Sequence, residues 1–470
     1  MKPIGHIAVG SIAQQILSII IFIILTRHLG AEGYGMIAAA LALATSIHNF
    51  GCNWMEPYIV RTGAKQVFHY NKLGDVYLIT TIISFILMLL GLMIITVLES
   101  FKIGNLQIYG GISLLTILLL GLFFLNLLRT GLETTQSFRG YGYSLWIDKI
   151  FYLAAVLVLF FYAQLDSKYA LYANATAMLL VAILGLVYFV KTHINLHIKS
   201  FFCWQEFFKS TSPVLLTTII IYFSSYPFVI LLVGNLSGLE QAAFISVAFI
   251  LSGLMLQPIE WITPTLLPKF TIAIESGNQK ILRDQIEKVL FPFVILYSIA
   301  VIIFIMFTIS TPIIPILLGE DFRNGIPVII LIVCTVVPKL INLLIIQMLY
   351  ARHQEMLILM AGLAGSLSFI SIAFLFSDSQ LFLIGLVIGE WVMLIIEIRA
   401  LKDIISLQIQ VKLLLLLGLF ITLSFLLLMT STEVILTVCA FILVILGTMA
   451  FKHREIFWNY VRQAITQPAI

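Results

Sequence analysis

Charged residues are scarce in this sequence. Only 10% of its 470 residues are Asp, Glu, Lys or Arg, and 61% are apolar, whereas soluble domains have about 25% and about 45–50%. A mean hydropathy of +1.11 excludes an ordinary soluble enzyme. Disorder is also excluded, because disordered chains are poor in apolar residues and rich in charge. The composition therefore predicts a polytopic membrane protein.

Residues that hold cofactors and metals are also lacking. No G-x-x-x-x-G-K-[ST] loop occurs, so ATP hydrolysis through that phosphate-binding loop is excluded. His193 and His197 share a helical face without a carboxylate or cysteine beside them, and no nucleophile, base and orienting carboxylate come together in one motif. We therefore expect no cofactor, no metal site and no enzymatic activity. Neither a disulfide framework nor a CxxC pair is visible in the four dispersed cysteines, Cys52, Cys203, Cys334 and Cys439.

Long apolar runs occupy almost the whole chain. A helix crosses a hydrocarbon core of ~30 Å with about 20 residues, and this window finds fourteen candidate spans. Each must be helical, because lipid offers no partner for an open strand edge. They lie near residues 7–26, 36–58, 76–98, 106–128, 147–163, 169–190, 211–233, 240–264, 289–311, 326–350, 357–377, 380–398, 412–429 and 433–451.

Basic residues are distributed unevenly among the connections between these spans. With the N-terminus in the cytoplasm, inner segments hold 21 of the 26 Lys and Arg residues and outer loops hold four, which is the positive-inside pattern. The even number of spans then places both termini in the cytoplasm. The net charge of +4 comes from dispersed residues and argues against a nucleic-acid partner. Two inner segments, 199–210 and 275–290, alternate charged and apolar residues and are interpreted as interfacial helices or as solvated linkers.

The spacing of the spans indicates an internal repeat. Spans 1 and 7 begin 204 residues apart, and spans 6 and 12 begin 211 residues apart. Parallel repeats of this kind are typical of transporters whose substrate site lies between two lobes. We predict an all-α membrane protein with two pseudo-symmetric six-helix lobes, residues 1–198 and 199–403, followed by an extra helix pair and cytoplasmic tail, residues 404–470.

Polar residues inside span 2 predict a hydrophilic cavity. His48, Cys52 and Glu56 follow one another at intervals of four residues, with Asn49 and Asn53 beside them. An ionisable side chain near the bilayer centre costs at least about 2.5–3.5 kcal/mol, so it should face water or a partner. Hydrogen bonding between packed helices is the structural alternative for such polar residues.

Three further ionisable residues lie inside the later spans. Lys339 falls in span 10 and Glu390 in span 12, where they form either a structural ion pair or a coupling-ion site. Glu260 lies near the inner end of span 8 and is either interfacial or a carrier of the coupling ion. Topology alone would also place Arg61, Arg129 and Arg139 at inner helix ends.

Two segments resemble motifs of polysaccharide flippases of the Wzx type, which belong to the MOP superfamily. Residues 26–35, TRHLGAEGYG, resemble their turn after the first span, and residues 312–322, PIIPILLGEDF, resemble their turn after span 9. The resemblance implies a protein that turns an undecaprenyl-pyrophosphate-linked oligosaccharide from the cytoplasmic to the periplasmic leaflet of a bacterial inner membrane. Many members have twelve spans, so the final pair is a departure; in the lipid II relatives an extra pair forms a groove for the lipid tail.

The resemblance also implies a cationic cavity and coupling to an ion gradient. Arg27 and His48, with Asn49 and Asn53, are the candidate substrate-binding residues, because Arg suits bidentate contact with a diphosphate. We expect the polymerase and the chain-length regulator of the same pathway as partners. The candidates at the inner entrance are Arg61, Arg129 and Arg139, and the candidates for ion coupling are Glu56, Glu260, Lys339 and Glu390.

Two rival functions remain open from the sequence. A multidrug antiporter of the same superfamily would require an acidic cavity. A polysaccharide polymerase or glycosyltransferase would require a large outer loop with arginines or a catalytic carboxylate pair, and the outer loops here are short.

Overall fold

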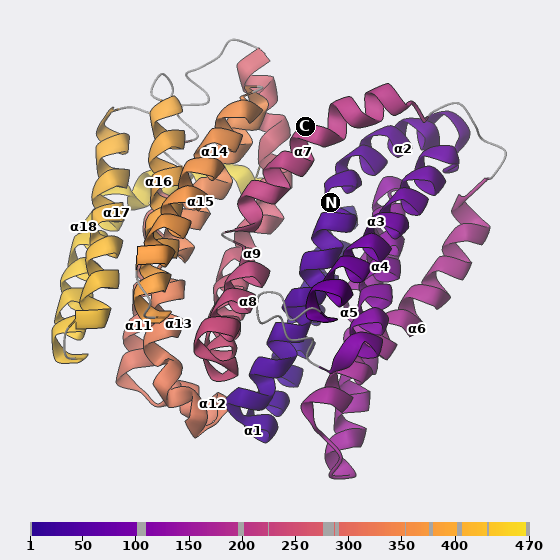
Figure 1. Cartoon of the computed structure of the whole chain (residues 1–470). Helices are drawn as coiled ribbons and strands as arrows, with labels where there is room; N and C mark the ends of the chain where they lie inside the picture. The colour runs from indigo at the N-terminus through magenta and orange to yellow at the C-terminus, as the bar shows by residue number, and fades with distance from the viewer. Residues whose placement is uncertain are drawn as a thin grey trace. The chain divides into compact units, whose positions relative to one another are not determined.

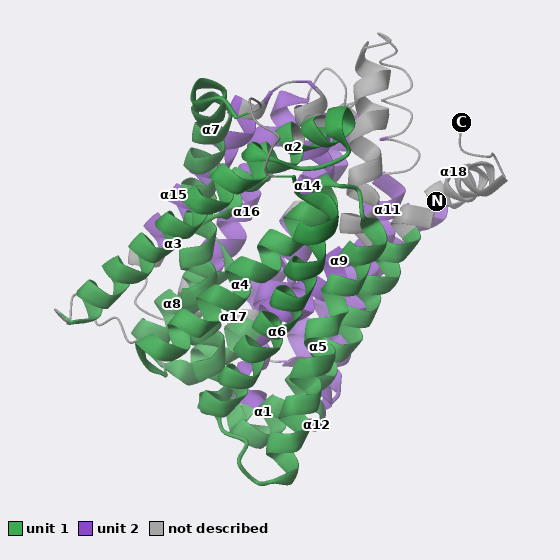
Figure 2. Ribbon diagram, turned by 90° about the vertical axis from the view of Figure 1, so that its right-hand side faces the viewer, with its two compact units in different colours: residues 1–246, 317–321 green, residues 247–316, 322–470 purple. Residues whose placement is uncertain are grey.

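The computed structural model describes residues 2–100, 110–195, 202–223, 225–275, 286, 291–352, 354–375, 379–401, 407–429 and 432–466. These residues form helices without a named β-strand, apart from an isolated bridge between Leu73 and Ile194. The chain divides into two compact units (Figure 2): unit 1 holds residues 1–246 and 317–321, and unit 2 holds residues 247–316 and 322–470. The lobes expected over 1–198 and 199–403 and the terminal pair over 404–470 stay a prediction.

Unit 1 is a bundle in which α1, α4, α5 and α6 pack on one another (Figure 1). α1 and α5 approach closely at glycines: a Cβ on Gly10 would collide with the backbone of Gly142, and a Cβ on Gly142 would collide with the backbone of His6. The elements of unit 1 are α1 (Lys2–Gly51), η1 (Asn53–Met55), α2 (Glu56–Tyr70), α3 (Asp75–Ser100), α4 (Gly111–Thr134), α5 (Phe138–Phe161), α6 (Ser167–His193), α7 (Trp204–Tyr222) and α8 (Tyr226–Ser237).

Unit 2 contains the remaining helices. α9 (Leu239–Glu275) begins in unit 1 and continues into unit 2, and residues 317–321, at the α12–η4 junction, belong to unit 1. The other elements are α11 (Phe291–Ser310), α12 (Ile313–Leu318), η4 (Glu320–Gly325), α13 (Ile326–Val333), α14 (Val336–Ala351), α15 (Glu355–Leu375), α16 (Ser379–Ala400), α17 (Leu407–Met429) and α18 (Thr432–Thr466).

Each of the fourteen predicted spans has a helical counterpart. Ten described helical stretches are long and apolar enough to cross a membrane, and two shorter apolar helices lie at Met356–Ile372 and Gln408–Ser424. The first stretch, Gly5–Tyr70, contains two predicted spans, because α1 breaks at Gly30. α16 corresponds to predicted span 12. The prediction of a multi-pass helical membrane protein is confirmed.

The glycines of the two motifs sit at turns. Gly30 has φ 68° and ψ −175°, and Gly319 has φ 111°. Side chains other than hydrogen are strained in such conformations, so glycine is the residue that allows both turns.

At two places the helix ends differ from the predicted span limits. Within predicted span 2 the chain leaves helical geometry at Cys52 and resumes as α2, with Pro57 in its first turn. Proline suits that position because its missing N–H has no partner in the first turn of a helix. The fifth span begins at Phe138 rather than near 147. Arg61 and Arg139 therefore lie within helices and not in loops.

From Trp204 on, the described part of segment 199–210 is helical and continuous with α7, so it is not a linker there, and its interfacial position stays a prediction. Trp204 starts α7, and Phe207 is 1% exposed. Burial of so large a ring stabilises a fixed position for the start of α7. Phe207 packs in a cluster with Trp54, Met55, Tyr58 and Val76. Segment 275–290 lies almost entirely outside the described residues.

Candidate functional site

A polar pocket lies within unit 1 between the α1–α2 connection and helices α3 and α4. Its empty volume is about 350 Å³. The break at Cys52 turns α1 into η1 and α2, so side chains spaced four residues apart still reach one pocket. The residues that line it are His48, Cys52, Asn53, Glu56, Ile59, Thr81, Ser84, Phe123, Asn126, Leu127 and Thr130.

Hydrogen bonds between α4 and the α1–α2 connection fix the polar side chains. Asn53 donates its Nδ2 to Oδ1 of Asn49, and Asn126 donates to Oδ1 of Asn53 at 3.3 Å. Thr130 donates its hydroxyl to Oε1 of Glu56 at 2.8 Å. The predicted stripe therefore has partners on α4, which no sequence spacing identified. The second carboxylate oxygen of Glu56, and the second lone pair on each amide oxygen, leave room for further hydrogen bonds.

His48 is 5% exposed, and its Nε2 has no hydrogen-bond partner among the described residues. A buried polar atom without a partner is costly, so it marks a place where a ligand group can bind. Arg27, predicted beside it, is exposed and does not line this pocket. The pocket lining contains a carboxylate, an imidazole, amides and hydroxyls but no Lys or Arg.

A larger apolar pocket adjoins this region of unit 1. It has an empty volume of about 1350 Å³ and is bounded by α1, α3, α7 and α8. Tyr222 and Ser46 join α7 to α1 at its wall through a hydrogen bond of 2.7 Å. Gly51 belongs to this lining and Cys52 to that of the polar pocket, so apolar and polar surfaces follow each other along the chain.

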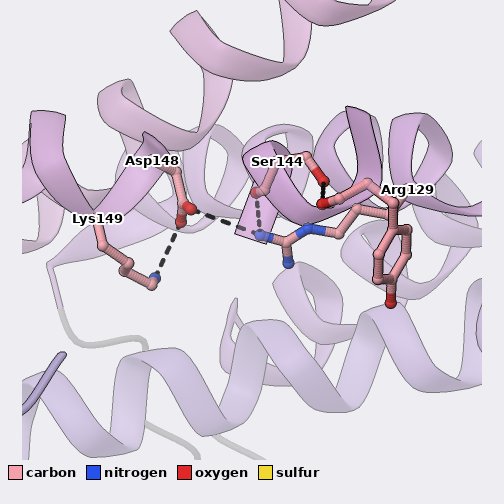
Figure 3. A network of polar contacts seen from close by, with 5 residues as sticks. Arg129, Ser144, Asp148 and Lys149 are labelled. Atoms are coloured by element: carbon pink, nitrogen blue, oxygen red, sulfur yellow. Dashed lines mark hydrogen bonds and ion pairs between the residues drawn. The ribbon is translucent and has the colours of Figure 1, made fainter. Parts of the chain in front are cut away.

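Arg129 belongs to a charge network between α4 and α5 (Figure 3). It donates to the carbonyl of Ser144 at 2.6 Å and lies 3.5 Å from Oδ1 of Asp148. Lys149 pairs with Oδ2 of Asp148 at 3.0 Å. The Asp148 side chain is 2% exposed, so this buried carboxylate neutralises Arg129 and ties the two helices together.

The other two entrance candidates differ from Arg129. Arg139 is exposed and extends along Tyr143, with Nε 3.4 Å from the hydroxyl and the guanidinium 5.7 Å from the ring centroid. Arg61 lies in α2, and its side chain is outside the described residues. The entrance assignment of all three stays a prediction.

Unit 2 brings together Lys339 of α14 and Glu390 of α16. Their Nζ and Oε1 atoms are 3.5 Å apart, and Lys339 also lies 5.3 Å from the ring centroid of Phe249. An ion pair is therefore present, as the structural alternative for these two residues requires, and a role in ion coupling stays a prediction. Glu260 lies in α9, and its side chain is outside the described residues.

Glu397 of α16 was not identified from the sequence. It is 0% exposed, and Asn342 of α14, in the amide orientation that presents Nδ2, reaches its two carboxylate oxygens at 2.5 and 3.0 Å. Glu397 follows Glu390 by seven residues, which places both on one helix face. The seven-residue spacing could have indicated a second buried carboxylate. Because Glu397 lies at the end of the predicted span, close to Arg399, its position in the sequence is that of a residue in the charged end of the helix.

The fold defines the class of protein. The chain is similar to the lipid II flippase MurJ in an inward closed conformation, with a TM-score of 0.66 and 14% identity over 95% of this chain and 98% of that chain. It is also similar to a multidrug resistance MATE family transporter in inward-facing form, with a TM-score of 0.61 and 15% identity over 86% and 95%. For an outward-facing form of such a transporter the TM-score is 0.57, with 17% identity over 88% and 96%. The protein therefore shares its fold with these transporters and with the lipid II flippase.

The family follows from the sequence comparison. The model of the polysaccharide biosynthesis protein family matches residues 1–274, more than half of the chain. The chain belongs to this family. The resemblance to polysaccharide flippases is thereby confirmed at the level of the family, and the proteins that share the fold include transporters of the MOP superfamily. No curated protein sequence matches the chain.

Proposed function

We propose that the protein is a flippase for an undecaprenyl-pyrophosphate-linked oligosaccharide, such as an O-antigen, capsule or exopolysaccharide repeat unit. It moves this lipid from the cytoplasmic to the periplasmic leaflet of a bacterial inner membrane by alternating access. The match of residues 1–274 to the polysaccharide biosynthesis family carries the proposal. The fold, shared with a lipid II flippase, supports it.

The two adjoining pockets of unit 1 suit an amphiphilic substrate. Amide, hydroxyl and carboxylate groups around Asn53, Asn126 and Glu56 can donate to and accept from sugar hydroxyls. The space inside this pocket holds little more than a water-sized group, so in this conformation it can engage a single hydroxyl of the oligosaccharide. The apolar lining near Phe50 suits an isoprenoid chain; α17 and α18 are a second candidate for that role.

The proposed topology places both termini in the cytoplasm. Polymerisation of the repeat units is carried out by a different protein of the pathway. Basic residues concentrate in the segments that this topology puts inside. The protein translocates its substrate without bond cleavage, so it is not an enzyme and uses no cofactor. Its partners are the bilayer, the lipid-linked oligosaccharide, and the polymerase and chain-length regulator of the same pathway.

An ion gradient supplies the driving force in this proposal. A cation that crosses the membrane potential releases about 2.3 kcal/mol per charge per 100 mV. Candidates for its binding are Glu56 in the polar pocket, the Lys339–Glu390 pair in unit 2, and Glu260. A carboxylate that exchanges partners between two conformations is the kind of group that can couple binding of a cation to such a change.

One observation favours a second candidate function, a cation-coupled drug antiporter like the MATE transporters. The polar pocket contains Glu56 but neither lysine nor arginine, which suits a cationic drug better than a diphosphate. The structural likeness to MATE transporters is compatible with this alternative.

Deletion of the gene distinguishes the two functions. For a flippase, the mutant loses surface polysaccharide while its lipid-linked precursor accumulates on the cytoplasmic leaflet, and drug sensitivity is unchanged. Rescue by the wild-type chain is expected to fail with Asn53→Ala and to succeed with Gln408→Ala, an exposed amide on α17. Normal surface polysaccharide in the deletion strain, together with increased drug sensitivity, would refute the flippase.

A further inference from the structure

A second polar cavity lies at one end of unit 1, where α1 begins, α4 turns into α5, and α6 ends. Its empty volume is about 1050 Å³, three times that of the pocket around His48. The turn between α4 and α5 shapes its floor: Gln136 adopts φ 56°, and Ser137 precedes the first turn of α5. This cavity is separate from the two pockets that the proposed function uses.

One guanidinium and two imidazoles from three helices meet at the cavity. His6 comes from α1, Arg139 from α5 and His193 from α6. Ser137 lies 3.5 Å from Nε2 of His193, which joins the turn to the end of α6. No acidic residue is among the described residues that line the cavity. A lining rich in donors and free of carboxylates attracts an anion.

Arg139 differs from Arg129, the other arginine near the α4–α5 turn whose side chain is described, in its charged partners. Arg129 is neutralised by the buried Asp148 (Figure 3). Arg139 contacts the hydroxyl and the ring of Tyr143, and neither group carries a negative charge. A guanidinium that stacks on an aromatic ring keeps its outer N–H groups available for a second partner, and its planar fork matches a phosphate.

The surroundings of the cavity are those of a membrane surface. Tyr143 and Tyr188 line it and are 44% and 66% exposed. Tyrosines of this kind gather where lipid headgroups meet water, with the ring in the apolar region and the hydroxyl outside it. On the topology proposed above, this end of unit 1 faces the cytoplasmic leaflet.

We propose that this cavity binds the phosphate group of an anionic lipid at the cytoplasmic membrane surface, with Arg139 as the main contact and His6, Ser137 and His193 around it. Two sources share this chemistry: a phospholipid headgroup and the diphosphate of the transported lipid. The proposal rests on the proposed topology for the side of the membrane and not on transport activity.

Equilibrium binding of a tail-labelled phosphatidylglycerol to the full-length protein in neutral detergent micelles tests the proposal. We expect Arg139→Gln to weaken this binding about tenfold, because it removes a charge-assisted bidentate contact. Arg399→Gln, which removes an exposed cation in unit 2, should leave it unchanged. Labelled phosphatidylcholine, which carries no net charge, should bind more weakly than phosphatidylglycerol.

Competition distinguishes the two sources. Inorganic pyrophosphate displaces the labelled lipid if the site recognises a diphosphate itself, whereas an unlabelled phosphatidylglycerol alone displaces it if the site needs a phospholipid. Equal affinity of wild type and Arg139→Gln, or an equal loss with Arg399→Gln, would overturn the proposal. Tyr143→Phe, which removes the hydroxyl contact of Arg139 and keeps the ring, should weaken binding by a smaller factor. Because no sugar precursor is used, a chain without flippase activity would still give a clear result.

Discussion

Gly30→Ala tests whether the first helix break depends on glycine. The residue has φ 68° and ψ −175° within α1. This combination lies in a region that is open essentially to glycine alone, and other residues held there cost about 1–3 kcal/mol. We therefore expect the free energy of unfolding of Gly30→Ala to fall by about 1–3 kcal/mol.

Steric overlap adds a second, smaller contribution. A Cβ at position 30 would lie 2.6 Å from Oδ2 of Asp321. Asp321 is exposed, and its carboxylate is the far end of a side chain that can turn away. Backbone strain should therefore dominate, and the double variant Gly30→Ala with Asp321→Ala should recover only a small part of the loss.

Two other glycines provide matched comparisons. Gly319 has φ 111°, and a Cβ there would meet nothing within 4 Å, so Gly319→Ala measures backbone strain alone. Gly253 lies inside helix α9 with equally open space. Gly253→Ala should stabilise by about 0.5–1 kcal/mol, because alanine is the better helix former.

Equilibrium unfolding in mixed detergent micelles, followed by tryptophan fluorescence, measures all four variants. The order of stability should be Gly253→Ala, wild type, Gly319→Ala and Gly30→Ala. A Gly30→Ala variant as stable as the wild type would refute the assignment of strain at this turn. Full recovery in the double variant would instead show that the contact with Asp321 is the cause.

Two further predictions concern the buried charges. Arg129→Met should lower the free energy of unfolding by about 3 kcal/mol, since it leaves buried Asp148 with one cation instead of two. Arg139→Met, at an exposed site, is the control and should change the free energy of unfolding by less than about 0.5 kcal/mol. Equal losses in the same detergent unfolding assay would contradict this reading of the network. Glu397→Gln should change stability by less than about 1 kcal/mol, because it keeps the shape and the contact with Asn342 and buries no charge, whereas Glu397→Ala should cost about 2–4 kcal/mol for a cavity and an unpaired amide. A large loss with Glu397→Gln would show that the negative charge itself stabilises the helix pair.

Hydropathy was sufficient to predict the helices, because each must present about 20 apolar residues to lipid. The spans of α3 and α6 were located within a few residues for this reason. Breaks inside helices were harder to place. The break at Cys52 depends on local backbone geometry, and the helix resumes with only Pro57 as a signal in the sequence.

The sequence predicted which residues line the polar pocket only where those residues lie along one stretch of helix. His48, Asn53 and Glu56 came together as expected from their spacing, but their partners Asn126 and Thr130 lie on α4, more than seventy residues away along the chain. Such contacts depend on how helices pack, and periodicity within a single helix carries no information about the neighbour.

A flippase for a lipid diphosphate needs positively charged side chains at the place where the diphosphate binds. The polar pocket around Asn53 contains no lysine or arginine among its lining residues, and Arg129 is already paired with Asp148. Arg139 and the exposed Arg27 are the described arginines in unit 1 that no carboxylate neutralises in the ion pairs of the structure. If the substrate is a lipid diphosphate, its phosphates and its sugars therefore bind to different parts of unit 1. Removing Asn53 should then impair recognition of the sugar, and removing Arg139 should impair recognition of the phosphate, each without the other.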